Sequence, residues 1–136
     1  MPSDLDIEFN EECIIEHNRL RALHGCPELI LDYELAKDAQ KYAEHLASVN
    51  ELEHCTDTDS GENLAFFTTT TVAQKKDFTG HFTQVVWKST TTAGFGRAWS
   101  KDRHSIYVVG RYDPPGNFSD EFLENVPPLI MNLRSD

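Results

Sequence analysis

Apolar side chains recur every three or four residues in two segments of the first half of the chain. In residues 4–24 the stripe consists of Phe9, Cys13, His17, Leu20 and His24. Asp32 is placed to cap a second helix from Tyr33 to about Val49, whose stripe is Leu35, Ala39, Tyr42 and Leu46, beside Ala36, Ala43 and Ala47. This spacing predicts two amphipathic helices, the first of which ends at Gly25.

The second half of the chain carries strand patterns and one further helix. Residues 62–67 form a short extended segment. Residues 93–100 and 105–113 alternate apolar with other side chains around a charged turn, which predicts an antiparallel hairpin. The helical spacing of residues 81–89 predicts a short third helix, and the tail after about residue 118 is expected to be irregular. This order of elements favours helices on both faces of a small antiparallel sheet.

Length and charge limit the classes of partner. A chain of 136 residues fits one domain. Lys and Arg number 12 against 23 Asp and Glu, which gives a formal charge of −11. Such a field repels phosphate backbones and anionic lipid surfaces, so nucleic acid is not an expected partner. No apolar run reaches the length of a transmembrane segment.

The cysteines and the first residues bear on cellular location. Cys13, Cys26 and Cys55 cannot all pair within one chain, which favours a reducing compartment. The opening MPSDLDIEFN lacks the basic flank and apolar run of a secretory signal. We therefore expect an intracellular protein, in the cytoplasm or associated with a membrane. The alternative is a secreted protein whose signal peptide is absent from the sequence.

Four motifs then point to a known family. The chain contains HNRLR (17–21), GENLA (61–65), GHFTQVVWKST (80–90) and IYVVGRYDPPGNF (106–118). In this order they resemble the motifs of the CAP superfamily, which comprises cysteine-rich secretory proteins, antigen 5 and pathogenesis-related proteins. The resemblance implies an α+β fold, a three-layer α-β-α sandwich with a small antiparallel sheet. It also implies a single CAP (SCP-like) domain over residues 1–136, with the irregular tail from about 118.

The intracellular, Golgi-associated branch of the superfamily is the most similar. Secreted members carry a disulfide cysteine in the second signature, where this chain has Gly110. The family's cleft normally has two histidines and two acidic residues. Carried over by motif, these are His81, Glu62 and, on the loop after the second helix, His54. The second acidic residue belongs to an extra helix with a Trp-Tyr-x-Glu pattern, and residues 66–79 contain none of these residue types.

Three interpretations of the cleft stay open. In the first, His54 and His81 bind Zn²⁺ or another divalent cation, because neutral imidazole is a good ligand for such ions. Glu62 would then be a ligand itself or would orient a histidine ring. In the second, all three side chains only line a wet polar groove. In the third, Glu62 is the catalytic base of a metal-assisted hydrolase.

Phe66 and Phe67 are candidates for binding. If the missing helix covers them in other family members, their side chains lie open here and form an apolar patch. Such a patch would bind a lipid or sterol, or a second copy of the chain in a homodimer. The alternative is that the shortened connector covers them. We expect a non-enzymatic CAP-domain protein that combines a cation-binding cleft with an apolar groove for lipid or sterol.

Overall fold

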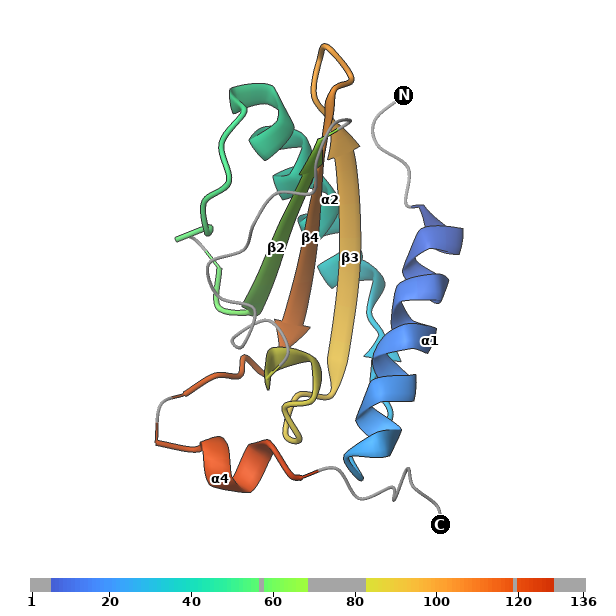
Figure 1. The fold of residues 1–136 in the computed structure, drawn as a ribbon, viewed down its shortest axis with the longest axis vertical. Helices are drawn as coiled ribbons and strands as arrows, with labels where there is room; N and C mark the ends of the chain where they lie inside the picture. Colours follow the sequence, from blue (N-terminus) through green and yellow to red (C-terminus); the bar gives the residue numbers. More distant parts are fainter. Residues whose placement is uncertain (1–5, 57, 69–82, 119, 129–136) are drawn as a thin grey trace.

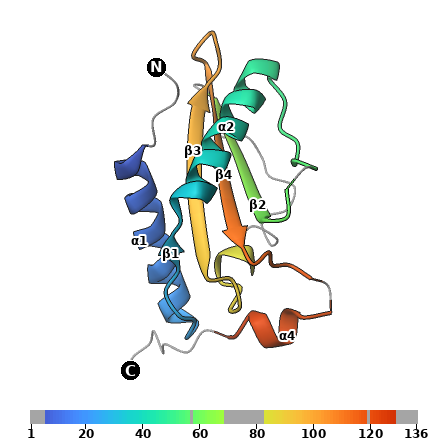
Figure 2. The same cartoon turned by 180° about the vertical axis from the view of Figure 1, so that it is seen from behind.

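The computed structural model describes residues 6–56, 58–68, 83–118 and 120–128. In chain order the elements are α1 (Ile7–Leu23), β1 (Ile30–Leu31), α2 (Tyr33–Val49), β2 (Gly61–Thr68), β3 (Thr92–Trp99), β4 (Ser105–Asp113) and α4 (Phe122–Asn125). Figure 1 shows α1 running alongside β3, and Figure 2 shows α2 lying across the other face of the sheet. The two predicted helices and the predicted hairpin are therefore confirmed.

The strands form one sheet in the order β1–β3–β4–β2. β4 pairs antiparallel with both β3 and β2, and the second pairing sets Glu62 directly opposite Arg111. β1 adds only two residues, and it pairs parallel with β3 through Ile30 and Thr92. The sheet is therefore antiparallel, as predicted, except for this short parallel strand, which the sequence shows only as an extended connection.

Both ends of α2 are fixed by local chemistry. The Asp32 side chain accepts hydrogen bonds from the backbone N–H groups of Glu34 and Leu35, at 2.8 and 3.2 Å, so it is the predicted cap. At the other end Asn50 takes a left-handed conformation with φ of 57°. The buried positions of the helix are mostly small: Ala36, Ala39, Ala43, Leu46 and Ala47.

The small residues let α2 approach β3 backbone to backbone. A Cβ atom added to Gly94 would lie 2.2 Å from the backbone N of Ala36. One added to Gly96 would lie 2.4 Å from the backbone N and Cα of Gln40. No side chain larger than hydrogen fits at these two strand positions, so the glycines are what allows the helix to lie this close.

The sheet has a separate apolar cluster on each face. On the α2 face, alanines of the helix and Leu46 pack against Leu64, Tyr107 and Val109. On the opposite face, Phe9, Cys13 and Ile14 of α1 pack against a second cluster: Leu29, Ala93, Phe95 and Tyr112. A helix therefore covers each face of the sheet, which confirms the three-layer α-β-α sandwich.

One arginine joins α1 to the 80–90 motif. Arg21 is 1% exposed, and no carboxylate pairs with it among the described residues. Its guanidinium instead donates to backbone carbonyls, at 2.8 to 3.1 Å, on Pro27, Val85, Trp87 and Thr90. Burial lowers the pKa of Arg21. This side chain fixes α1 against the segment that follows His81.

The C-terminal part of the described chain is not wholly irregular. The predicted helix 81–89 is only partly correct: residues 83–85 are helical, residues 86–89 are not, and 81 and 82 lie outside the described residues. In the tail, α4 is a helical turn that the sequence pattern does not predict. Asn125 docks it, since its backbone and side-chain oxygens accept from the N–H groups of Lys88 and Ser89 at 2.8 and 2.9 Å. Among the helices described, none has the length and apolar character needed to cross a bilayer.

Candidate functional site

Glu62 is the centre of the candidate site. It lies near the start of β2, and its side chain is 5% exposed. Its Oε1 accepts from His54 Nδ1 and from the backbone N–H of Cys55, each at 2.9 Å. Its Oε2 accepts from Arg111 Nε, also at 2.9 Å. Both carboxylate oxygens are therefore engaged, one with the loop before β2 and one with β4.

The Glu62 contact fixes the chemistry of His54. Because an ionised carboxylate only accepts hydrogen bonds, Nδ1 of the neutral ring carries the proton and Nε2 carries the lone pair. The His54 side chain is 64% exposed, whereas its carboxylate partner is buried. A histidine held in this way by a carboxylate is the arrangement common around metal-binding imidazoles.

Arg111 supplies the charge that balances Glu62. Its side chain is 5% exposed, and the antiparallel pairing of β2 with β4 places it opposite Glu62. Its guanidinium carbon also lies 5.2 Å from the centre of the Tyr42 ring. Removing either member of a buried ion pair leaves an uncompensated charge. Neither Arg111 nor Tyr42 is among the site residues that the motifs predict.

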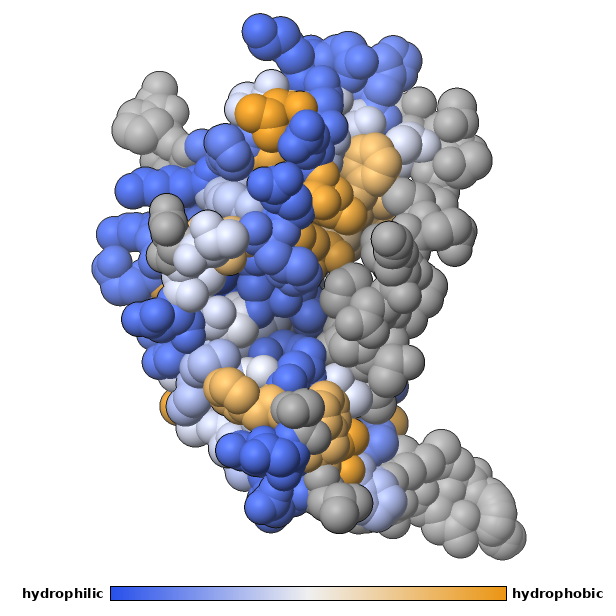
Figure 3. Space-filling model, turned by 90° about the vertical axis from the view of Figure 1, so that its left-hand side faces the viewer, coloured by the Kyte–Doolittle hydropathy of each residue, from blue (hydrophilic) through white to orange (hydrophobic). Residues whose placement is uncertain are grey.

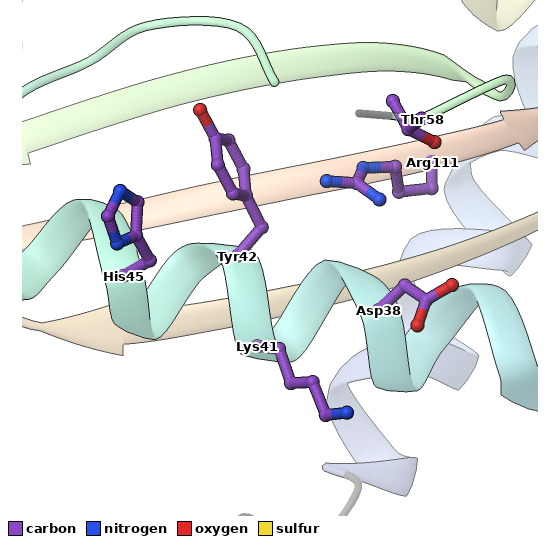
Figure 4. A pocket seen from close by; sticks show the side chains of 6 residues that line it. All are labelled: Asp38, Lys41, Tyr42, His45, Thr58 and Arg111. Atoms are coloured by element: carbon purple, nitrogen blue, oxygen red, sulfur yellow. The ribbon is translucent and has the colours of Figure 1, made fainter. Parts of the chain in front are cut away.

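A polar pocket opens beside this ion pair (Figure 4). It has a volume of about 320 Å³ and is lined by side chains of α2, of the following loop and of β4: Asp38, Lys41, Tyr42, His45, Thr58 and Arg111. The Tyr42 hydroxyl donates to the backbone carbonyl of Glu53, and its ring stacks on His45 with centroids 5.7 Å apart. Burial and the nearby Glu62 carboxylate raise the pKa of Tyr42 to about 12, so its hydroxyl stays neutral.

A second, smaller cavity lies on the other face of the sheet. It has a volume of about 190 Å³, and its lining residues include Cys13, His17, Ala65, Val85, Val108 and Tyr112. His17 donates from Nδ1 to the Cys13 carbonyl at 2.8 Å and accepts at Nε2 from the Tyr112 hydroxyl at 2.7 Å. Burial lowers the pKa of His17 to about 4 and raises that of Tyr112. The polar groups of this cavity are therefore neutral and bonded to one another.

The structure brings together some of the predicted site residues. His54 and Glu62 are in direct contact, whereas His81 lies outside the described residues. Phe66 and Phe67 point to opposite faces of the sheet. Phe66 packs on Tyr107 with ring centroids 4.9 Å apart, and Phe67 is 38% exposed. Within the described residues, no group of three or more His, Cys, Asp and Glu side chains is arranged to hold a metal ion.

The surface around β2 and the loop before it is mainly polar. Figure 3 shows this side of the molecule as largely hydrophilic, with hydrophobic side chains gathered in separate areas. This agrees with the formal charge of −11.

Comparisons with known proteins identify relatives. The model of the Cysteine-rich secretory protein family (CAP) matches residues 14–112. The human Golgi-associated plant pathogenesis-related protein 1 is 39% identical, over 89% of this chain and 94% of the relative. The pathogenesis-related protein PR-1 of Medicago truncatula is 30% identical, over 83% of this chain and 78% of the relative. Protein PRY2 of Saccharomyces cerevisiae is 35% identical over 90% of this chain, which spans only 42% of that longer protein.

Solved structures show the same fold. The structure of BmVAL-1 matches with a TM-score of 0.69 at 16% identity, over 86% of this chain and 82% of that one. The crystal structure of NaASP2 with Zn²⁺ matches with a TM-score of 0.65 at 20% identity, over 87% and 85% of the two chains.

Proposed function

This chain belongs to the cysteine-rich secretory protein (CAP) family, and on that premise we propose that it is a binding protein whose cleft takes up a divalent cation at His54. The observation that carries the proposal is the hydrogen bond of 2.9 Å between Glu62 and His54 Nδ1. It holds an exposed imidazole with its Nε2 lone pair directed away from the carboxylate.

The donor set fits a weak, open site. Both Glu62 oxygens already accept hydrogen bonds, so Glu62 acts by orienting His54 and not as a ligand. The described residues thus supply one ligand, and we assign the second to His81 on the family resemblance, with water completing the coordination. Such a donor set suits Zn²⁺, which accepts imidazole and water together. Bound Zn²⁺ would contribute a positive charge in a strongly acidic protein.

A Zn²⁺ titration by calorimetry at pH 7.5 tests this proposal. We expect saturable binding of about one ion per chain, lost in His54→Ala and kept in His104→Ala, which removes an exposed histidine from the β3–β4 turn. Glu62→Gln should weaken binding by about ten- to a hundredfold, because the ring loses its carboxylate partner. Equal binding by the native chain and His54→Ala would overturn the proposal.

The small cavity between α1 and the sheet favours a second function, the binding of an apolar chain. Its volume of about 190 Å³ is below the range of about 300–1,000 Å³ that small-molecule pockets usually have. It therefore suits a short acyl chain, or the end of a longer lipid, better than an entire sterol.

An NMR titration with 1-octanol, a neutral probe, tests this second function. Ala65→Leu would fill the cavity and abolish saturable shifts at Val108, whereas Ala22→Leu, on the exposed side of α1, would leave them unchanged. Shifts of equal size in both variants would exclude the cavity as the site.

The alternatives have less support. A hydrolase needs a base that can take a proton, and Glu62 already accepts three hydrogen bonds. A homodimer through Phe67 stays a prediction, which a shift to monomer for Phe67→Ser in a sizing experiment would favour.

We propose an intracellular location. Relatives carry names that indicate Golgi association in one case and secretion in another, the latter being secreted protein RBT4 of Candida albicans. No disulfide joins the three cysteines in the described part of the chain, which supports this proposal.

A further inference from the structure

The polar pocket of Figure 4 contains a buried guanidinium with unused donors. Arg111 is 5% exposed, and its one hydrogen bond among the described residues runs from Nε to Glu62. The guanidinium has two further groups, Nη1 and Nη2, with four N–H donors between them. These have no acceptor in the described part of the chain, and the guanidinium lines the pocket. Neither Nη group is among the buried side-chain atoms that lack a hydrogen-bond partner, so both open into the pocket, where a bound anion would accept from them.

The two Nη groups are spaced to meet a planar anion. Parallel N–H groups of arginine pair with both oxygens of a carboxylate in one plane, and such charge-assisted pairs are about twice as strong as neutral ones. The Tyr42 ring stands next to the guanidinium, and His45 stacks on that ring. The pocket therefore offers an anion-binding fork at the inner end and an aromatic wall beside it.

The charges around the pocket select the kind of anion. Arg111 and Lys41 contribute two positive charges, and Glu62, Asp38 and the nearby Glu53 contribute three negative ones. A dianion such as sulfate would meet these carboxylates without a net positive field to offset them. A monoanion that pairs locally with the arginine avoids most of this repulsion. The volume of about 320 Å³ lies at the lower end of the usual range for small-molecule pockets.

We propose that this pocket binds a small monocarboxylate, whose two oxygens accept from the Nη groups of Arg111 and whose apolar part lies on the Tyr42 ring. Lys41 and Asp38 stand at the α2 side of the pocket, where they raise and lower the affinity for an anion. The site uses the side of Arg111 that faces away from Glu62, so it does not depend on a cation at His54.

An NMR titration of the ¹⁵N-labelled full chain with sodium benzoate at pH 7.0 tests the proposal. Saturable shifts are expected at the Arg111 Nε–H group and at the backbone amide of Tyr42. Acetate should bind more weakly, since it has no ring to lie on Tyr42, and sulfate, which is a dianion at this pH, should give no saturable shift there. The proposal is overturned if benzoate gives no saturable shift at Arg111. Tighter binding of sulfate at the same residues would overturn the choice of a carboxylate.

Two charge variants on α2 should change the affinity for benzoate in opposite directions. Lys41→Gln should weaken benzoate binding by about two- to fivefold, and Asp38→Asn should strengthen it by a similar factor. Lys37→Gln is the matched control, because it removes the same charge from an exposed side chain of α2 that does not line the pocket. If Lys37→Gln and Lys41→Gln weaken benzoate binding equally, the effect comes from the overall charge of the protein and not from the pocket. This outcome would overturn the proposal.

Two further variants separate the proposals. Arg111→Lys keeps the charge and removes the pair of Nη groups, so it should abolish benzoate binding. Thermal unfolding shows whether this variant folds. If it does not fold, the benzoate affinities of the α2 variants test the proposal. His54→Ala should leave the benzoate affinity unchanged while abolishing Zn²⁺ binding. Loss of both ligands in His54→Ala would contradict the independence of the two sites.

Discussion

Replacing Arg21 by methionine tests how α1 is held to the 80–90 motif. In the native chain, four backbone carbonyls accept hydrogen bonds of 2.8 to 3.1 Å from this buried guanidinium, and a fifth, on Lys88, lies at 3.5 Å. A hydrogen bond from a charged donor contributes roughly 1.5–3 kcal/mol, and an orphaned buried acceptor costs a similar amount. Four independent bonds would thus amount to about 6–12 kcal/mol, comparable to the whole stability of a domain, about 5–15 kcal/mol.

The expected loss is smaller than this sum for two reasons. Contacts within one network are not additive, and methionine removes the cost of burying the cation. We therefore expect Arg21→Met to lower the free energy of unfolding by about 3–5 kcal/mol, mainly through the cost of leaving the buried carbonyls without a donor. The free energy of unfolding of Arg21→Lys should lie between those of the native chain and Arg21→Met, because a single ammonium group cannot reach carbonyls that lie on different segments.

Urea unfolding, followed by circular dichroism and tryptophan fluorescence, measures this effect. Arg19→Met is the matched control, since Arg19 is an exposed arginine on the same helix whose ion-pair partner in the described part of the chain is Glu16. Its unfolding midpoint should equal that of the native chain. A free energy of unfolding for Arg21→Met within about 1 kcal/mol of the native value would refute the reasoning.

Two further predictions concern the seam between α2 and β3 and the buried histidine. Gly96→Ala places a Cβ atom 2.4 Å from the backbone of Gln40, so it should cost about 2 kcal/mol or more, seen by calorimetry as a lower Tm; an unchanged Tm would contradict the close contact. Burial holds the pKa of His17 near 4, below its ordinary value of 6.5, so the unfolded chain takes up this proton at higher pH. The contribution of His17 to the free energy of unfolding is therefore fully present above pH 6.5 and is lost as the pH drops towards 4. The loss is about 2 kcal/mol at pH 5. His17→Gln should remove this part of the pH dependence, and an identical slope in native and variant chains would disprove the assignment.

Local patterns were sufficient to predict α1, α2 and the hairpin of β3 and β4. The stripe and the Asp32 cap define α2, because both depend on residues close together in the chain. The stripe predicts that Leu35 is buried in the core, but Leu35 is only half-buried. The small residues Ala36, Ala39 and Ala43 are fully buried instead. The glycines of β3 explain the difference, since they leave room only for small helix residues.

The site depends on contacts that local patterns do not contain. Glu62 and Arg111 are 49 positions apart, and only the register of β2 with β4 sets them opposite each other. The acceptors of Arg21 include backbone carbonyls more than 60 positions away in the chain, which no residue type reveals. The family resemblance names Glu62 through the GENLA motif and His54 through its place on the loop after α2, and the structure shows a hydrogen bond between these two side chains.

The backbone contact between α2 and β3 also bears on how this protein can change during evolution. At Gly94 and Gly96 there is no layer of side chains whose repacking could absorb a different residue, so these two positions tolerate only glycine. Asp38 and Lys41 lie on the exposed side of the same helix, where substitutions leave the contact with the strand intact. Mutation can therefore alter which ligands the pocket accepts without moving the helix that forms its wall. The scaffold and its selectivity are free to evolve at different rates.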